Sequence, residues 1–209
     1  MLYRMTDAFS DAFSMFMLIE YNQDDKPIII TSDVKEIELY KELYLKYFNS
    51  NYFKKSKIKQ KPKDFSEKCI TVHKNPIFDM THLFKEYVRD KSIFESKEHY
   101  CYSLVSYRNT HKGMDDKMME YIRAILKDGI DLGNSRNFVS FEEMEQKFLT
   151  LCSSKFYVGS EVSWSIFCQF FHKHCMHMFQ LSPYFSTQEI KLNDLILRVN
   201  PHTVMEKNL

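Results

Sequence analysis

Apolar residues recur at helical spacing over much of the chain. After Asp33, whose side chain can cap a helix together with Glu36, the apolar positions from Val34 to Tyr47 repeat every three or four residues. The same spacing, with further capping boxes at 140–143 and 186–189, predicts five or six helices with short connections between residues 77 and 199. The pattern therefore predicts an all-α fold.

The segment 162–181 differs from the other predicted helices because apolar residues fall on all its faces. A helix of this kind must be buried by its neighbours or span a membrane. Gln169, His172 and Lys173 interrupt the apolar run before 18 residues accumulate, which argues against a membrane span. We therefore expect residues 162–181 to form the buried central helix of a bundle.

The first 69 residues have a weaker pattern. Residues 1–20 predict one amphipathic helix, and residues 27–31 predict a brief strand too isolated to build a sheet. Beyond this region, residues 100–107 predict a further short helix. From Lys54 to Lys63 six of ten residues are lysine, which is typical of a solvated linker. We therefore expect an N-terminal extension with a Lys-rich linker at 1–69 and a helical bundle domain at 70–209.

The lysine run also allows a functional interpretation. Basic patches with interleaved aromatic residues can bind nucleic acid or anionic lipid, and Tyr52 and Phe53 lie beside the run. A net charge of +1 provides no global field that would attract nucleic acid, so we expect no nucleic-acid partner.

Composition limits the remaining classes. Hydrophobic residues make up 44% of the 209 residues, which is enough for a core, and only four are glycine, which argues against a phosphate-binding glycine loop. Five scattered cysteines predict reduced thiols rather than a disulfide framework. The segment 15–19 is too short for a membrane span and lacks the features of a signal peptide.

The segment around the single tryptophan resembles the first homology motif of the B-cell lymphoma (Bcl) family of apoptosis regulators. That motif has Val-Asn-Trp-Gly-Arg followed by small and aliphatic residues and Phe-Phe, at the start of a buried central helix. Matching residues are Val162, Trp164, Phe170 and Phe171, while Ser163, Ser165 and Ile166 replace the Asn, Gly and Arg. Residues 80–88 and 126–131 are similar to the family's fourth and third motifs.

The resemblance implies a Bcl-like bundle that regulates apoptosis by binding amphipathic death-ligand helices in a hydrophobic groove. We expect one groove wall at Phe141, Met144, Phe148 and Leu151 and the other at Val162, Ser163 and Ser165, with Trp164 as a core anchor beneath them. Because Ile166 replaces the family's Arg, the contact with the ligand's Asp is missing, and apolar anchors should dominate binding.

Partners and location follow from the same resemblance. We expect pro-apoptotic amphipathic helices or other Bcl-family proteins as partners, with no membrane span and no cofactor. The protein would be cytoplasmic and would reach the mitochondrial outer membrane through those partners.

Two alternatives stay open: a helical interaction protein unrelated to that family, and a metal-dependent enzyme. On a continuous helix Cys168, His172 and Cys175 would share one face and could bind zinc, although their spacing matches no zinc signature and no fourth ligand is identifiable. The sequence contains no nucleophile elbow, phosphate loop or His-Glu-x-x-His motif, so we expect no enzyme and no metal site.

Overall fold

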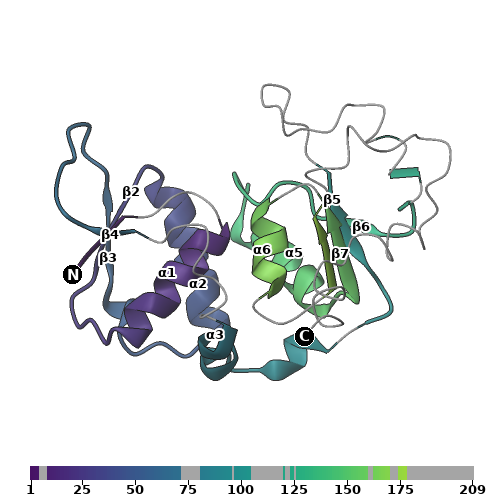
Figure 1. Ribbon diagram of the computed structural model, residues 1–209, viewed down its shortest axis with the longest axis horizontal. Helices are drawn as coiled ribbons and strands as arrows, with labels where there is room; N and C mark the ends of the chain where they lie inside the picture. Colours follow the sequence, from purple (N-terminus) through teal and green to yellow (C-terminus); the bar gives the residue numbers. More distant parts are fainter. Residues whose placement is uncertain are drawn as a thin grey trace, which may run out of the picture.

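The protein has a mixed α/β fold. A computed structural model describes residues 1–4, 9–71, 81–95, 97–104, 120, 123–124, 126–159, 162–169 and 174–177. Two four-stranded parallel sheets form the outer layers, and the helices between them fill the interior (Figure 1). The prediction of an all-α, Bcl-like helical bundle is therefore wrong.

The first sheet is built by the N-terminal part of the chain. Its strands are β1 (Leu2–Arg4), β2 (Ile28–Thr31), β3 (Lys57–Gln60) and β4 (Ile70–Thr71), in the order β3-β2-β1-β4. Helix α1 (Phe9–Tyr21) connects β1 to β2, and helix α2 (Val34–Tyr47) connects β2 to a short 3-10 turn η1 (Phe53–Lys55) and β3. Alternating strands and helices are the pattern that produces a parallel sheet.

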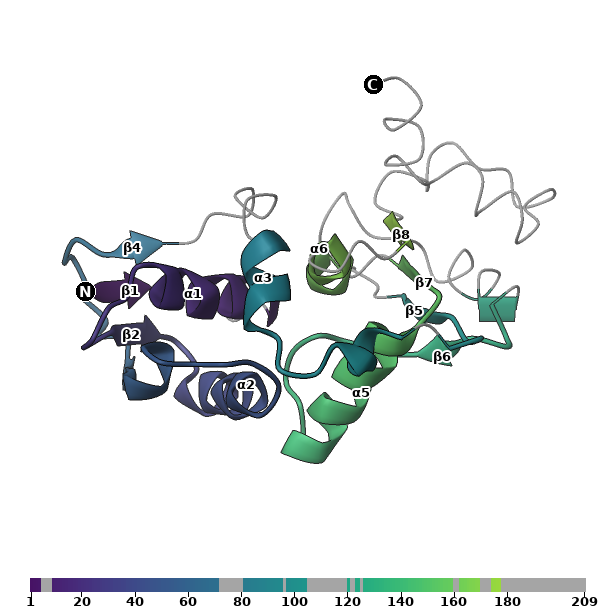
Figure 2. The ribbon, with the colours of Figure 1, turned by 90° about the horizontal axis from the view of Figure 1, so that it is seen from below.

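The second sheet is built by the C-terminal part. Its strands are β5 (Cys101–Ser103), β6 (Ile130–Asp131), β7 (Phe156–Gly159) and β8 (His174–His177), in the order β6-β5-β7-β8. Helix α5 (Phe141–Ser153) connects β6 to β7, and helix α6 (Val162–Gln169) connects β7 to β8. Helix α3 (Thr81–Tyr87), which packs against α1, and the 3-10 turn η3 (Lys91–Phe94) join the two halves (Figure 2).

Helix α1 lies at the centre of the molecule. It packs against α2, α3 and α6, and 11 of its 13 residues are buried, including Asp11 and Glu20. A helix covered on all sides has no solvent-facing stripe. The segment does contain a helix, but the prediction that this helix is amphipathic was wrong. The all-round burial that we expected for residues 162–181 is found in the first helix of the chain, and the described side chains of α6 are buried as well.

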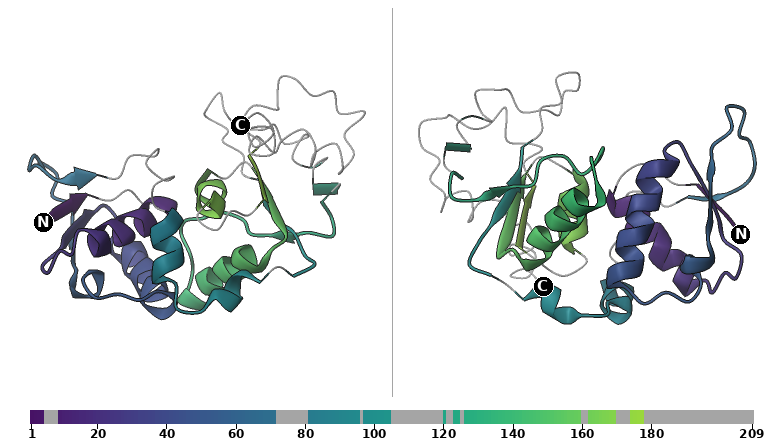
Figure 3. Two further views of the ribbon diagram at one scale, coloured as in Figure 1. Left: turned by 60° about the horizontal axis from the view of Figure 1, so that its bottom comes forward. Right: turned by 180° about the vertical axis from the view of Figure 1, so that it is seen from behind.

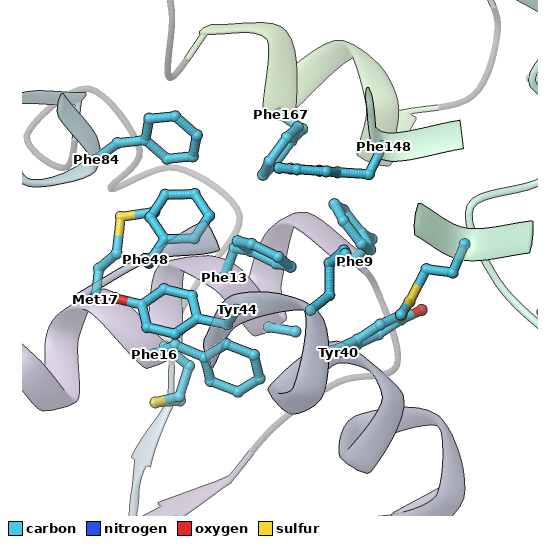
Figure 4. Packing of buried hydrophobic residues seen from close by; sticks show 14 of the residues in the cluster. Phe9, Phe13, Phe16, Met17, Tyr40, Tyr44, Phe48, Phe84, Phe148 and Phe167 are labelled. Atoms are coloured by element: carbon cyan, nitrogen blue, oxygen red, sulfur yellow. The ribbon is translucent and has the colours of Figure 1, made fainter. Parts of the chain in front are cut away.

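Aromatic side chains from both halves form one core (Figure 4). The ring of Phe9 lies 5.0 Å from those of Trp164 and Phe167, and Phe13 lies 5.2 Å from Phe167 and 6.1 Å from Phe148. Ring pairs at these distances stabilise a core beyond the area that they bury. Because α1 contributes to these contacts as much as α5 and α6 do, the two sheets share a hydrophobic core.

The predicted central helix is shorter than expected. Helix α6 ends at Gln169, and His174–His177 form strand β8, which pairs in parallel with β7. Short apolar runs cannot be assigned to helix or buried strand from periodicity alone, because both are apolar on every side. Residues 100–107 were likewise predicted as helix, and their described part contains β5.

The predicted boundary at residue 69 divides a folded unit. Strand β4 begins at Ile70 and pairs with β1, and the supposed linker forms η1 and β3. Residues 27–31 do form a strand, but β2 is an inner strand of the sheet rather than an isolated one. The run Ile28-Ile29-Ile30 is typical of a strand that is buried in a parallel sheet.

A buried carboxylate fixes the turn before β3. The side chain of Glu20, only 4% exposed, accepts hydrogen bonds from the backbone amides of Asn51, Tyr52 and Phe53 at 2.8–3.3 Å and from the hydroxyl of Ser50. A carboxylate is stable inside a protein when it is hydrogen-bonded in this way. Glu20 thereby attaches the end of α1 to η1.

Candidate ligand-binding site

Each sheet has one point at which its strand order reverses direction. In the first sheet β2 and β4 lie on opposite sides of β1, and in the second sheet β6 and β7 lie on opposite sides of β5. Open parallel sheets bind ligands outside the carboxyl ends of their strands at such switch points. The candidate positions are therefore the edge after β1 and β4 and the edge after β5 and β7.

The helices that follow these two edges meet between the sheets (Figure 1). Helix α1 follows β1, α6 follows β7, and the first turns of the two helices are in contact. The hydroxyl of Ser163 accepts a hydrogen bond from the Ser10 backbone amide at 2.9 Å and donates one to the Ser10 hydroxyl at 3.2 Å. Both serines are buried although 153 residues separate them.

The first turn of α1 adds further polar groups. The Ser14 hydroxyl donates to the Ser10 carbonyl at 2.8 Å, and the carboxyl-bearing side chain of Asp11 is only 4% exposed. A carboxylate in the first turn of a helix is stabilised by the positive end of the helix dipole. Polar side chains are thus concentrated where α1 begins, within an otherwise aromatic interior.

On the second sheet, a single carbonyl connects three elements. The carbonyl oxygen of Gly133, after β6, accepts hydrogen bonds from the Ser103 hydroxyl at 2.5 Å and from the indole nitrogen of Trp164 at 3.3 Å. Gly159 ends β7 beside Ser103, and a Cβ atom there would collide with the Ser103 carbonyl and the Tyr157 hydroxyl. Glycine is required at this position for β5 and β7 to pair closely at the switch point.

The two helix N-termini differ in charge. Both present the positive end of a helix dipole at their edge, which favours an anionic group. The first turn of α1 contains Asp11. The first turn of α6 contains no acidic residue, but Glu161 directly precedes it in the sequence. Asp11 at the α1 end can accept a hydrogen bond from a hydroxyl group.

The predicted groove wall on residues 141–151 lies mainly in the core. Met144, Phe148 and Leu151 have no exposed area and pack against the shared core, while Phe141 is partly buried beneath the ammonium of Lys46, 5.5 Å from its ring centre. Met144, Phe148 and Leu151 therefore form part of the shared core.

The opposite predicted wall lies in α6. Ser163 and Trp164 are buried, Trp164 with no exposed area, and Val162 and Ser165 belong to the same helix, although their side chains lie outside the described residues. The structure thus brings Ser163 against α1 rather than against α5. Among the described side chains that were predicted to bind a partner, only Ser163 lies where α1 and α6 meet.

The predicted zinc face does not form as a helix face. Cys168 is buried in α6, Cys175 lies in β8, and His172 lies outside the described residues. Among the described residues no group of three or more His, Cys, Asp or Glu side chains is arranged to hold a metal ion. In the same part of the chain, no helix has the length and apolar character needed to cross a membrane.

Comparisons with protein-family models, with curated proteins and with solved structures find no match to this chain. Binding of a death-ligand helix stays a prediction that no comparison tests. It depended on an all-α bundle with a groove between two helices, and the fold is not of that kind.

The residues at the junction were mostly missed in the sequence. Ser10 and Asp11 lie within the tandem Asp-Ala-Phe-Ser at 7–14, which we took for part of an amphipathic helix. Gly159, directly after the strand-like run Phe156-Tyr157-Val158, carried a usable signal, because a glycine between a strand and a helix often marks a close backbone approach.

Proposed function

We propose that the protein is a group-transfer enzyme that takes a nucleotide-activated donor and a hydroxyl-bearing acceptor. The observation that carries this proposal is the contact between Ser10 and Ser163, which joins the first turns of the helices that follow β1 and β7. Two helix N-termini that meet offer two neighbouring binding positions, which a reaction between two substrates needs.

We assign the two substrates from the side chains in the first turns of the two helices. The diphosphate of the donor binds at the α6 end, where the first turn has no acidic residue. The acceptor binds at the α1 end, where Asp11 would repel a phosphate but can accept a hydrogen bond from a hydroxyl. A dinucleotide is the less suitable ligand, because the segment between β1 and α1 contains no glycine.

The proposed chemistry uses Asp11 as a general base. The acceptor oxygen forms a bond to the transferred group, the bond between that group and the donor diphosphate breaks, and the acceptor proton moves to the Asp11 carboxylate. The nucleoside diphosphate leaves with the electron pair of the broken bond. The positive end of the α6 helix dipole favours the negative charge that develops on the leaving diphosphate, and this interaction is stronger where water is excluded.

Thermal unfolding with a panel of ligands tests the binding step. We expect nucleoside diphosphates and nucleoside diphosphate sugars to raise the melting temperature, since a ligand at 100 times its Kd stabilises the folded state by about 2.7 kcal/mol. Nucleosides without phosphate should have a much smaller effect. A melting temperature that no nucleotide changes, together with no heat in calorimetric titration, would rule out the proposal.

Asp11→Asn tests the chemical step. With the donor that binds best, we expect the release of nucleoside diphosphate to fall by about 10²–10⁴-fold, the usual contribution of a general base, while donor Kd changes little. Glu36→Gln is the matched control, because Glu36 is an equally buried carboxylate (5% exposed) that binds Tyr40 and Asn137 away from the junction. Equal loss of activity in both variants would assign Asp11 a structural role.

A further inference from the structure

The first sheet has one face without a described helix. Side chains alternate between the faces of a strand, and Tyr3, Ile29 and Ile58, which are paired across β1, β2 and β3, belong to the shared core or pack against it. Helices α1 and α2 cover that face, and the opposite face lies on the outer side of the molecule (Figure 3, right). Parallel sheets are normally covered on both faces, so this arrangement is unusual.

Cations and aliphatic side chains share the outer face. One row across the strands consists of Arg4, Ile30 and Lys59, and the next consists of Leu2, Ile28 and Lys57. Arg4, Lys57 and Lys59 are exposed, Leu2 and Ile28 are half-buried, and Ile30 is buried. We call Arg4, Lys57 and Lys59, together with Leu2 and Ile28, the basic face.

These three cations are not neutralised by ion pairs within the described part of the chain. The ion pairs in that part of the chain involve Lys46, Lys55, Lys147, Lys155 and the N-terminus, and Lys55 is bound to Asp25 at 2.7 Å. The connection from β3 to β4, residues 61–69, loops out on the same side of the sheet (Figure 1). It contains three lysines and two acidic residues, so it adds positive charge.

We propose that the basic face is a docking surface for an anionic phospholipid bilayer. Exposed cations spread over two strand spacings, roughly 10 Å, can contact several headgroups of a flat surface at once. The half-buried aliphatic side chains between them can contact the apolar boundary below the headgroups. The inference is independent of the proposed enzymatic function.

Nucleic acid fits the same charges less well. Single strands bind through exposed aromatic side chains, but Phe53 is buried and stacked on Phe16 with ring centres 4.0 Å apart, and Tyr3 is buried as well. Duplex recognition uses a helix or a two-stranded ribbon that enters a groove, and the described basic face is a broad sheet surface. Of the two aromatic residues expected beside the lysine run, only Tyr52 is partly exposed, and its ring lies 5.2 Å from the Lys55 ammonium.

Vesicle binding tests the proposal with the full chain. Vesicles of phosphatidylcholine with 30% phosphatidylserine should sediment the protein in dilute salt, and vesicles of phosphatidylcholine alone should not. Each lysine near an anionic surface contributes about fivefold in affinity, corresponding to about 1 kcal/mol. The double variant Lys57→Gln with Lys59→Gln should therefore bind about 30-fold more weakly.

The control is the pair Lys85→Gln with Lys91→Gln, which removes the same charge from exposed lysines of α3 and η3. This pair should bind like the unaltered protein if the basic face is the contact, and an equal loss would show that only net charge matters.

Absence of binding to anionic vesicles would overturn the proposal. The lysines of β3 would then serve to keep this edge strand from pairing with strands of other chains. A DNA duplex or single strand that binds more tightly than the vesicles, and loses this affinity in the first pair alone, would overturn it in favour of nucleic acid.

Discussion

Two buried tyrosines on α2 show how much a single hydroxyl group can matter. The hydroxyl of Tyr40 lies 2.7 Å from Glu36 Oε1 and 3.1 Å from the Ser135 carbonyl oxygen, and thus connects the two halves. The hydroxyl of Tyr44, four residues later, is buried without a hydrogen-bond partner among the described residues. Burial, with smaller contributions from Glu20 and Tyr87, raises the pKa of Tyr44 well above 10.0.

Replacing each tyrosine by phenylalanine should have opposite effects. Tyr44→Phe should leave stability unchanged or raise it by about 1 kcal/mol, because it removes an unsatisfied polar group from the core and retains the stacking on Phe48. Tyr40→Phe should lower stability by about 1–3 kcal/mol, because Glu36 loses a buried donor. Urea denaturation of both variants measures the difference, and a loss of stability in Tyr44→Phe would imply that its hydroxyl is bonded.

At the scale of elements, the sequence predicted the two helices that have one exposed face. Asp33 and Ser140 cap α2 and α5 as expected, accepting from the amides of Glu36 at 2.9 Å and Glu143 at 3.2 Å. Elements without an exposed face were missed or misassigned, because their pattern depends on what covers them. Strands such as β5 and β6 are too short for any periodicity to identify.

An ion pair between these two correctly predicted helices should make stability depend on pH. Glu145 on α5 accepts from the hydroxyl of Tyr47 at 2.5 Å and pairs with Lys46 at 2.5 Å, both on α2. Burial alone would raise the pKa of Glu145, but the hydrogen bonds from Lys46 and Tyr47 outweigh it and lower this pKa below 4.5. The ionised carboxylate therefore stabilises the fold above about pH 4.5, and this contribution is lost as the pH falls through the lowered value.

Glu145→Gln should reveal this contribution. We expect the variant to be about 1 kcal/mol less stable than the unaltered protein at pH 7, as is usual for a partly exposed ion pair, and the difference to shrink below about pH 4.5. Denaturant titrations from pH 3 to pH 7 measure it. Glu38→Gln, an exposed carboxylate on α2, is the control, and a difference that does not change with pH would contradict the assignment.

At the scale of the whole molecule, the main contacts could not be predicted from the sequence. Ser10 and Ser163 are 153 residues apart, and no local pattern links the first helix to the sixth. The candidate site depends on this contact, so it could not be found before the fold was known. The sequence did indicate a buried segment around Trp164, but not the surface against which it packs.

The shared core predicts that neither half is stable alone. From the sequence we expected a bundle domain at 70–209 that is separate from an N-terminal extension, but residues 70–209 alone would lack α1 and α2 and would expose Phe148, Phe167 and Trp164. We now expect it to be insoluble or to lack a cooperative unfolding transition. Expression of residues 70–209 alone, compared with the full chain by circular dichroism and denaturation, tests this, and a cooperatively folded fragment would show that the second half forms its own core.

The position of the single tryptophan gives the protein an internal optical probe. The indole of Trp164 lies 5.0 Å from Phe9 and donates to the Gly133 carbonyl, so it contacts both halves next to the Ser10–Ser163 contact. Separation of the halves would admit water around the ring and shift its emission to longer wavelength. Ligand titrations and unfolding can therefore be followed by intrinsic fluorescence, without a label and with no other tryptophan to obscure the signal.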